Sequence, residues 1–183
     1  MKKGAELSPC RRYRYALWRI WDDSKPAVMF IGLNPSTADE TVDDPTLIRC
    51  INFAKAWGYG GVYTANLFAY RATQPKDLLK RKRVVGKDND YWLMQLADKT
   101  ELIIAAWGND GQYQNRAEKV KQQIQPLHYL KMNKSGQPAH PFTLKQTSPR
   151  PYLRLLINGP IIIDKFNFII CWDSYFLVTI YIS

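Results

Sequence analysis

The residues with the clearest chemical potential follow an apolar run near the N-terminus. Residues 28–32 have the composition of a buried strand, and they pass directly into a polar loop that carries Asn34, Pro35, Ser36 and Asp39. In an open α/β sheet, the loops at the carboxyl ends of the strands meet ligands, because they carry polar groups over a rigid base. We therefore interpret this loop as part of a binding or catalytic site. An ordinary turn contains the same residue types and is the alternative.

Two carboxylates, Asp43 and Asp44, stand directly before Pro45, where an apolar helical pattern begins that extends over residues 45–57. The positive end of a helix dipole helps to keep a carboxylate ionised. Such a group, like that of Asp39, is able to accept a proton from water or to offset positive charge on a substrate. A plain helix cap before a first-turn proline gives the same pattern, so both interpretations stay open.

Polar and aromatic residues also follow three later apolar runs, at residues 62–68, 101–107 and 127–132. Because parallel strands bring their carboxyl ends together, we predict that these residues share one cleft with the first loop. Every parallel sheet has such loops, so the alternative is that only one or two of them are functional. The candidate binding or catalytic residues in the later loops are Asn66, Tyr70, Arg71, Trp107, Asn109 and His140.

Two of these candidates, Asn66 and Arg71, have a competing structural interpretation. The Asn66 amide offers both a donor and an acceptor, which suits the edge of a nucleobase, but a buried Asn also bonds neighbouring backbone. Arg71 is interpreted as holding a phosphate or an acidic loop residue, with a surface salt bridge as the competing view. His140 lies in an irregular loop between two prolines, whereas His128 falls within a predicted strand, where a structural role is favoured.

The alternation of four apolar runs with helical patterns predicts an α/β fold. We expect a three-layer sandwich, in which helices flank a central, mainly parallel four-stranded sheet with right-handed crossovers. Residues 13–21 form a predicted amphipathic strand, in which apolar side chains alternate with Arg14 and Arg19, and we expect it to pair antiparallel along one edge. Helices are predicted at residues 45–57, 76–83, 88–97 and 109–124.

The length of 183 residues suits one domain with a substantial core, which we place at residues 1–153. A composition of 46% hydrophobic and 23% charged residues is that of a soluble globular protein. Residues 154–183 form an apolar extension, which we interpret as added strands or an irregular appendage. Charged residues interrupt it, so it lacks the roughly 20 apolar residues of a membrane helix, and membrane association is the minor alternative.

The net charge of +10 favours a polyanionic partner, either nucleic acid or a nucleotide. A solvated basic surface gives the same excess of charge and is the alternative. The whole excess lies before Arg154. The residues that we predict to contact phosphates lie in one basic stretch and are Lys76, Lys80, Arg81, Lys82 and Arg83.

The cysteine and histidine content argues against a metal centre. The three cysteines, Cys10, Cys50 and Cys171, are far apart, and the chain has only two histidines. Free thiols fit a reducing cytoplasm, which is the predicted location, and the N-terminal residues lead into no apolar signal core. The sequence has no motif for ATP, NAD or a metal, so we predict no cofactor.

Several of these segments together resemble one family. Residues 12–152 resemble the domain of unknown function 1643, and the apolar tail after Tyr152 lies outside that resemblance. The family implies no established activity. The motifs that carry the resemblance are Gly-Leu-Asn-Pro-Ser-Thr-Ala-Asp (32–39), Asp-Asp-Pro-Thr (43–46), Asn-Leu-Phe-Ala-Tyr-Arg-Ala-Thr (66–73), Ala-Trp-Gly (106–108) and Gly-Gln-Pro-Ala-His-Pro (136–141).

The order of these motifs is similar to that of the uracil-DNA glycosylase superfamily, whose members are hydrolases of DNA repair. The resemblance implies that Asn34 positions water, Asn66 reads the base and His140 polarises the base carbonyl. The chain departs from the pattern in two places: Phe142 follows the His-Pro pair where Ser is usual, and Asn34 replaces the Asp of the most active members. An amide cannot accept a proton from water, so general-base chemistry falls to one of the three acidic residues of the loop.

We therefore predict a glycosylase-like hydrolase of a nucleobase N-glycosidic bond in nucleic acid or a nucleotide. Cleavage develops positive charge on the sugar and negative charge on the base, which calls for a carboxylate and a hydrogen-bond donor. A base in duplex DNA must be flipped out, and Phe68 or Tyr70 is a candidate to stack on it. The alternative is a non-catalytic binding module with the same cleft. The clustered polar loops argue against a purely structural protein.

Overall fold

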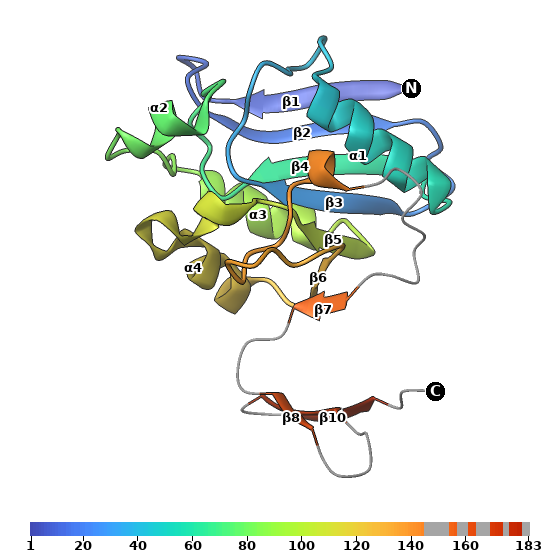
Figure 1. Ribbon diagram of the computed structural model, residues 1–183. Helices are drawn as coiled ribbons and strands as arrows, with labels where there is room; N and C mark the ends of the chain where they lie inside the picture. Colours follow the sequence, from blue (N-terminus) through green and yellow to red (C-terminus); the bar gives the residue numbers. More distant parts are fainter. Residues whose placement is uncertain (145–153, 157–160, 164–168, 174–175, 181–183) are drawn as a thin grey trace.

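The computed structural model describes residues 1–144 and the backbone of four later strands, at residues 154–156, 161–163, 169–173 and 176–180. The main sheet has the strand order β1-β2-β4-β3-β5-β6-β7 (Figure 1). Its strands are β1 (Lys2–Leu7), β2 (Arg14–Ile20), β3 (Ala27–Gly32), β4 (Gly61–Asn66), β5 (Leu102–Ala105), β6 (Leu127–Tyr129) and β7 (Arg154–Leu156). The helices are α1 (Pro45–Ala56), α2 (Pro75–Leu79), α3 (Asn89–Ala97) and α4 (Arg116–Gln123), with 3₁₀ turns at Asn109–Asn115 and Pro141–Thr143.

The sheet is mixed. The neighbours β4 and β3, β3 and β5, and β5 and β6 pair in parallel, whereas β1 with β2, β2 with β4, and β6 with β7 pair antiparallel. Helices pack on this sheet, which confirms the predicted α/β class. Strands β3, β4 and β5 end at the same edge, because parallel strands share a direction, and this edge carries the candidate loops.

The predicted antiparallel strand at residues 13–21 is present as β2, but it does not lie at an edge of the sheet. Strand β1 pairs with β2 on the side of β2 that faces away from β4, from Lys2 opposite Ile20 to Leu7 opposite Arg14. Strand β1 was not predicted from the sequence. Its residues include few large apolar side chains and are mostly exposed or half-buried, so no apolar alternation marks the strand.

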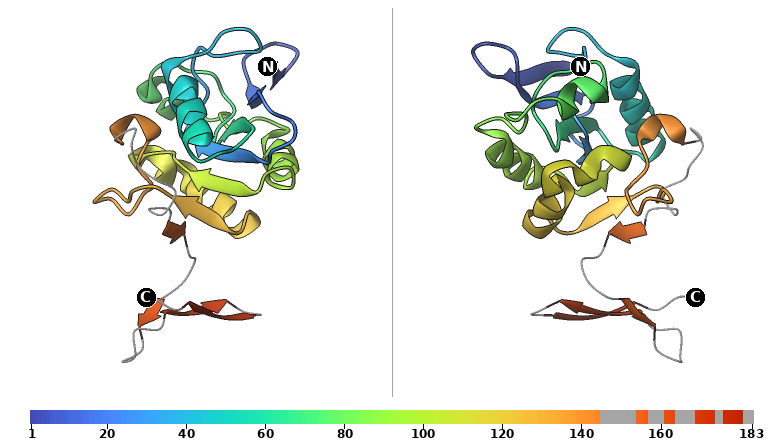
Figure 2. Two further views of the ribbon diagram at one scale, coloured as in Figure 1. Left: turned by 90° about the vertical axis from the view of Figure 1, so that its right-hand side faces the viewer. Right: turned by 60° about the vertical axis from the view of Figure 1, so that its left-hand side comes forward.

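Two hydrophobic clusters cover the two faces of the sheet. Residues of β3 alternate between them: Val28 and Phe30 face α1, whereas Met29 and Ile31 face α3 and α4. This alternation is the period-2 geometry of a strand buried on both sides. Figure 2 shows the helices on opposite sides of the sheet. The face that carries α1 is the one that holds the candidate site.

The start of α1 has the predicted form. Asp44 is its N-cap residue and accepts a hydrogen bond from the Leu47 N–H, and Pro45 occupies the first turn. The predicted helix at residues 109–124 is instead divided into a 3₁₀ turn and α4. Gln114 and Asn115 between them have positive φ angles of 53° and 54°, which no continuous helix accommodates.

The apolar extension contains strands, as one of the two interpretations expected. Strand β7 pairs with β6, and β8 (Ile161–Ile163), β9 (Ile169–Asp173) and β10 (Phe176–Ile180) form an antiparallel sheet. The domain boundary that we placed after residue 153 falls outside the described residues. In the part of the chain that the structure describes, no helix has the length and apolar character needed to cross a membrane.

Candidate active site

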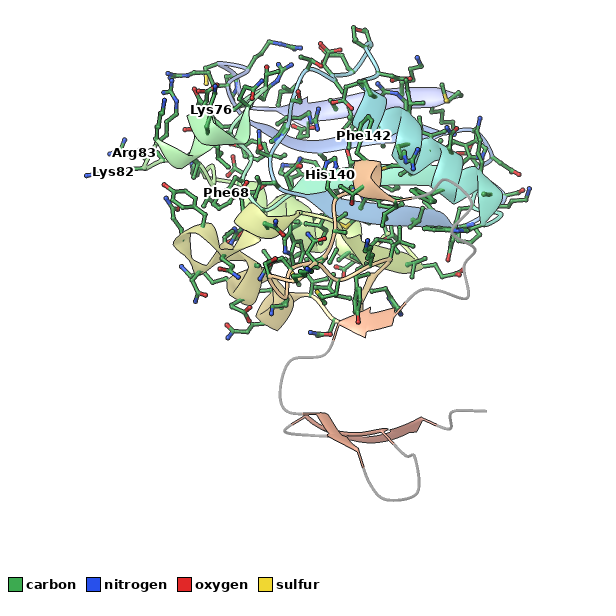
Figure 3. The ribbon with its side chains drawn as sticks, in the orientation of Figure 1. Phe68, Lys76, Lys82, Arg83, His140 and Phe142 are labelled. Carbon is green, nitrogen blue, oxygen red and sulfur yellow. The ribbon has the colours of Figure 1, made fainter. Side chains whose placement is uncertain are left out.

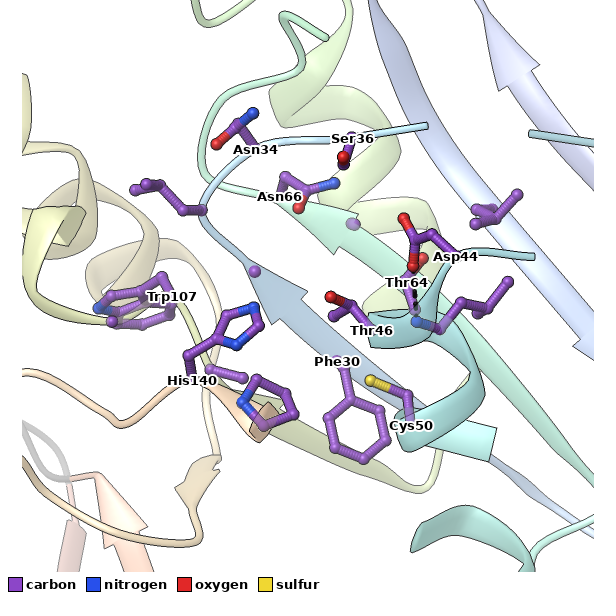
Figure 4. A pocket seen from close by; sticks show the side chains of 18 of the residues that line it. Phe30, Asn34, Ser36, Asp44, Thr46, Cys50, Thr64, Asn66, Trp107 and His140 are labelled. Atoms are coloured by element: carbon purple, nitrogen blue, oxygen red, sulfur yellow. Dashed lines mark hydrogen bonds between the residues drawn. The ribbon is translucent and has the colours of Figure 1, made fainter. Parts of the chain in front are cut away.

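A pocket of about 380 Å³ lies at the edge where β3, β4 and β5 end, beside the N-terminus of α1. It brings together residues from the loop after β3, from β4, from the segment after β5 and from the His140 loop. Figure 4 shows two sides of this pocket, which we call the aromatic wall (Trp107, His140) and the hydroxyl wall (Ser36, Asp44, Thr46, Thr64). Of the residues predicted for the site, those that line the pocket are Asn34, Ser36, Asp44, Asn66, Trp107, Asn109 and His140.

The register of the sheet determines which β4 side chains enter the pocket. Phe30 lies opposite Thr64 and Gly32 opposite Asn66, so these four positions share the α1 face. A Cβ atom at Gly32 would lie 2.8 Å from Asn66 Oδ1, closer than such atoms approach. Glycine at position 32 therefore leaves the space that the Asn66 amide occupies. Asn66 is 6% exposed, and its Nδ2 has no hydrogen-bond partner among the described residues.

Asn34 joins the two loops that border the pocket. Its Nδ2 donates to the carbonyl oxygens of Ala72 (2.7 Å) and Pro35 (3.0 Å). Pro35 is buried and does not line the pocket, whereas Ser36 does. The donor atoms of Asn34 are therefore occupied by backbone, and its Oδ1 is the atom left for a ligand or a water molecule.

The three loop carboxylates have different environments. Asp44 is 8% exposed and lines the pocket, where its oxygens accept from the N–H groups of Leu47 (2.8 Å) and Ala38 (3.4 Å). Asp43 lies outside the pocket and pairs with the buried Arg19 at 2.7 Å. Of the three predicted acidic residues, the structure therefore brings only Asp44 into the pocket.

Asp39 also lies outside the pocket, where it closes a local turn. Its Oδ1 accepts from the backbone N–H groups of Val42 and Thr41 and from the Thr41 hydroxyl, each at 2.9 Å. These hydrogen bonds lower the pKa of Asp39 to about 2, because they stabilise the ionised form. A carboxylate of that pKa is a weak base, so the geometry gives Asp39 a structural task.

His140 projects from the aromatic wall, and its protonation follows from its contacts. Nδ1 accepts a hydrogen bond from the Phe142 N–H at 3.3 Å, so the proton of the neutral ring resides on Nε2. Burial lowers the pKa of His140, and the nearby Asp44 charge opposes that shift. The Phe142 ring, which is 53% exposed, stacks on the imidazole at a centroid distance of 6.1 Å. A neutral imidazole with an Nε2–H donor therefore borders the pocket.

Trp107 and Asn109 connect the segment after β5 to the His140 loop. Trp107 is 2% exposed and donates its Nε1–H to Gln137 Oε1 at 2.7 Å. Asn109 Oδ1 accepts from Asn133 Nδ2 and from Ser135 Oγ, both at 2.7 Å. These contacts hold the aromatic wall in position.

Among the pocket residues that sequence reasoning missed, two have buried polar atoms without full hydrogen bonding. Arg14 and Thr64 line the pocket, although Arg14 was expected on the polar side of an amphipathic strand. Arg14 is only 5% exposed, and its Nε has no partner among the described residues; the same holds for Thr64 Oγ1. The Arg14 backbone N–H donates to the Ala69 carbonyl oxygen and its Nη1 donates to the Ala38 carbonyl oxygen, so the segments after β4 and β3 cover this end of β2. The available signal for Thr64 was its position two residues before Asn66, which places the two side chains on the same face of β4.

The predicted basic residues border a second, open hollow beside the pocket. Tyr70, Arg71, Lys80 and Arg81 line this hollow of about 480 Å³, and Ala72 lines both cavities. The Arg81 guanidinium lies 4.9 Å from the centre of the Tyr70 ring. The side chains of Lys76, Lys82 and Arg83 are exposed nearby and line neither cavity (Figure 3).

The structure separates several predicted residues from the pocket. Arg71 contacts the carbonyl oxygens of Thr37 (3.4 Å) and Arg11 (3.5 Å), so it holds loop backbone instead of facing the pocket. Tyr70 packs edge to face against Tyr13. Phe68, a candidate to stack on a base, is fully buried against Tyr113 in the core and is inaccessible to a ligand. Within the described residues, no three His, Cys, Asp or Glu side chains gather in a metal-binding cluster.

All residues that line the pocket lie within the part of the chain that matches one protein family. The model of a family described as "Protein of unknown function (DUF1643)" matches residues 14–142. The chain belongs to this family. The matched DUF1643 span begins at Arg14 and ends just after Pro141, so it contains every residue that lines the pocket. No curated protein and no solved structure matches the chain significantly.

Proposed function

We propose that this DUF1643 protein binds a nucleobase in the pocket and hydrolyses the N-glycosidic bond of a nucleotide, free or within nucleic acid. The observation that carries the proposal is that the Asn66 amide, the His140 Nε2–H and the Asp44 carboxylate line one cavity. Its volume of about 380 Å³ lies within the range of small-molecule sites, roughly 300–1,000 Å³.

His140 is proposed to stabilise the leaving base. When the bond between C1′ and the base nitrogen breaks, its electron pair moves onto the base and negative charge develops on a base oxygen. A donor directed at that oxygen stabilises the charge more in the transition state than in the ground state. The Nε2–H is available for this task, because Nδ1 is occupied by the Phe142 N–H.

Asn66 is proposed to recognise the base edge. Its unpartnered Nδ2 requires an acceptor, which a base carbonyl oxygen or ring nitrogen provides. Asn66 is 6% exposed and lies beside Gly32 of the paired strand β3, so packing restricts the amide before a ligand binds.

Asp44 and Asn34 are proposed to act at the sugar. Both oxygens of Asp44 already accept backbone hydrogen bonds, which favours charge stabilisation at C1′ over proton abstraction. Asn34 Oδ1 would orient the water molecule that adds to C1′. The water gives its hydroxyl to the sugar and its remaining proton to the departing base or to solvent.

The order of motifs along the chain supports the same assignment, since it is similar to that of uracil-DNA glycosylases. The substitution of Asn for Asp at position 34 and the Phe142 that follows His-Pro are departures from that pattern. The basic hollow next to the pocket supports a phosphate-bearing substrate.

A non-catalytic nucleotide-binding or nucleic-acid-binding module is the second candidate. One observation favours it: the Asp44 carboxylate acts as a helix cap, and Asp39 and Asp43 lie outside the pocket. Such a module would bind the same ligands in the same pocket and release them unchanged.

Base release is the measurement that separates the two candidates. The full-length chain is incubated with nucleosides, nucleoside monophosphates, and single- and double-stranded DNA that contains uracil or alkylated bases, and free base is quantified. We expect release that His140→Ala abolishes and that the matched control His128→Ala leaves unchanged, because His128 lies on β6 outside the pocket. Binding without release from any substrate would establish the module.

A further inference from the structure

The pocket contains polar groups that the protein itself does not satisfy, one on the hydroxyl wall (Thr64) and two on other lining residues. Arg14 Nε, Thr64 Oγ1 and Asn66 Nδ2 are all buried, and none has a hydrogen-bond partner among the described residues. All three side chains line the same pocket. A buried polar atom without a partner costs free energy, and native proteins retain such groups where a ligand or an ordered water completes them. Two of the three atoms are N–H donors, so the missing partner must offer acceptors.

Of the three side chains, Arg14 has the most hydrogen-bond donors to satisfy. A guanidinium has five N–H donors, but in the described part of the chain this one makes a single hydrogen bond, from Nη1 to the Ala38 carbonyl oxygen, and forms no ion pair. Its burial lowers its pKa to about 10, which reflects the cost of an incompletely solvated positive charge. An acceptor that is also anionic would satisfy both the open N–H groups and the charge.

The neighbouring Arg19 shows that β2 is able to satisfy a buried arginine completely. Arg19 is 0% exposed, and it pairs with Asp43 through Nε and Nη2 at 2.7 Å. It also donates to the carbonyl oxygens of Trp18 and Asp39, each at 2.7 Å. Arg14 has no such partner. The difference indicates a binding role for Arg14 and a structural role for Arg19.

Other groups of the hydroxyl wall fit the same anion. Arg14 and Asp44 both contact the backbone of Ala38, so the guanidinium lies beside the start of α1. The 12-residue helix directs its positive dipole end toward this wall, where Thr46 lines the pocket. Asp44 remains as an acceptor for the hydroxyl groups of a sugar placed between base and anion.

We propose that Arg14, together with Thr64 of the hydroxyl wall, binds a terminal phosphate monoester, while the aromatic wall holds the base of the same ligand. The phosphate must be terminal, because Arg14 is 5% exposed and a phosphodiester has a strand that continues on both sides. The ligand is therefore a nucleoside monophosphate or the phosphorylated end of a strand. This inference rests on the proposed function and specifies the substrate class.

Calorimetric titration of the full chain tests the inference. The probes are each nucleoside with its 5′-monophosphate, inorganic phosphate alone, and a short oligonucleotide with or without a 5′-phosphate. We expect the phosphate to raise affinity for the wild-type protein by about tenfold or more, as a charge-assisted contact does. A gain with the monophosphates alone identifies a free nucleotide, and a gain with the phosphorylated oligonucleotide as well identifies a strand end.

Three variants test whether the gain in affinity from the phosphate depends on Arg14 and Thr64. Arg14→Gln should abolish the phosphate-dependent gain, and Arg12→Gln, the same change at an exposed arginine outside the pocket, should keep it. Thr64→Val provides a second test if the Arg14 variant fails to fold. It removes an unpartnered buried hydroxyl, so the melting temperature should stay the same or rise while the phosphate gain falls.

The outcomes separate this inference from the proposed function. If nucleosides bind and lose their base but phosphate adds nothing, or if the gain persists in Arg14→Gln, the phosphate site is wrong and the proposed function stands. If inorganic phosphate binds through Arg14 but no nucleoside does, the phosphate site stands without the nucleobase pocket. If no probe binds, both are wrong.

Discussion

The two buried arginines of β2 lie five residues apart and have opposite environments. Arg19 is enclosed by Asp43 and by backbone carbonyls of the loop after β3, so its hydrogen bonds hold that loop to the sheet. Arg14 opens onto the pocket with one hydrogen bond among the described residues. The same residue type on one strand thus stabilises the fold in one region and leaves unmet bonding capacity in the other. The unpartnered Arg14 Nε at this cavity is one of the observations from which we infer a binding role.

The adjacent carboxylates Asp43 and Asp44 also have opposite environments. Asp43 neutralises Arg19 outside the pocket, whereas Asp44 faces the cavity from the cap of α1. Successive residues in a loop point in different directions, so neighbours in sequence reach different regions. The comparison between a self-satisfied region and an unsatisfied one generates four predictions.

The largest effect is expected on stability, at Arg19. Arg19→Met should lower the free energy of unfolding by about 3 kcal/mol, because it leaves Asp43 and two carbonyl oxygens without their partner. Arg14→Met should change it by less than about 1 kcal/mol, since it removes one hydrogen bond together with a poorly paired buried charge. Urea denaturation measures both values. Equal losses of unfolding free energy at the two positions would contradict the difference that we infer between the environments of Arg19 and Arg14.

The second prediction compares the turnover of variants at Asp44 and Asp43. Asp44→Asn should slow base release roughly a hundredfold, because it removes the charge that faces the pocket. Asparagine is also a good N-cap, so the melting temperature should change little. Asp43→Asn should have the reverse effect, a lower melting temperature with turnover retained, because Asp43 pairs with Arg19 outside the pocket. Comparable loss of turnover in both variants would mean that Asp44 acts through the loop and not through its charge.

A third, smaller effect is expected at the basic hollow. If it contacts a nucleic-acid backbone, log K should fall against log salt with a slope of about −0.9 per phosphate contact on duplex DNA. Charge reversal at Arg81 and Arg83 should weaken binding and reduce that slope, whereas reversal at the exposed Lys99 and Lys119 should not. Filter-binding titrations across a salt series provide the measurement, and salt-independent binding would exclude a phosphate-contacting role.

The smallest effect concerns pH. Burial lowers the pKa of both His140 and His128 in the folded protein below the ordinary value of about 6.5. The unfolded chain then binds more protons as the pH falls through about 6.5, so stability is present above that pH and declines below it. Replacing either histidine by Gln should make the stability fall less steeply as the pH decreases, by the amount which that histidine contributes. Thermal melts between pH 7.5 and about 5 measure it, and a decline that survives the double variant would belong to other groups.

Local patterns were sufficient for much of the scaffold. The apolar run before Asn34, the Asp-Pro start of α1 and the polar residues after each strand act over a few residues, and the structure contains the corresponding strands and helix. The sharing of one pocket by Asn34, Asn66 and His140 also followed from sequence, because parallel strands must end at the same edge.

The roles within the site required the tertiary structure. The burial of Arg14 depends on the segments that contain Ala38 and Ala69, which lie far from it in sequence, and no local alternation reports on them. Phe68 was a candidate to stack on a base, and only the packing of Tyr113 against it shows that it belongs to the core. The division of labour between Asp43 and Asp44 likewise depends on which of them meets Arg19.

The sequence by itself therefore determined the α/β class, the edge of the sheet at which the polar loops gather and the family to which the chain belongs. The tertiary structure alone decided which polar groups are satisfied and which remain open at the pocket. The physical reason is that strand and helix formation depends on neighbours along the chain, whereas hydrogen-bond satisfaction depends on partners that only the folded chain brings within a few ångströms.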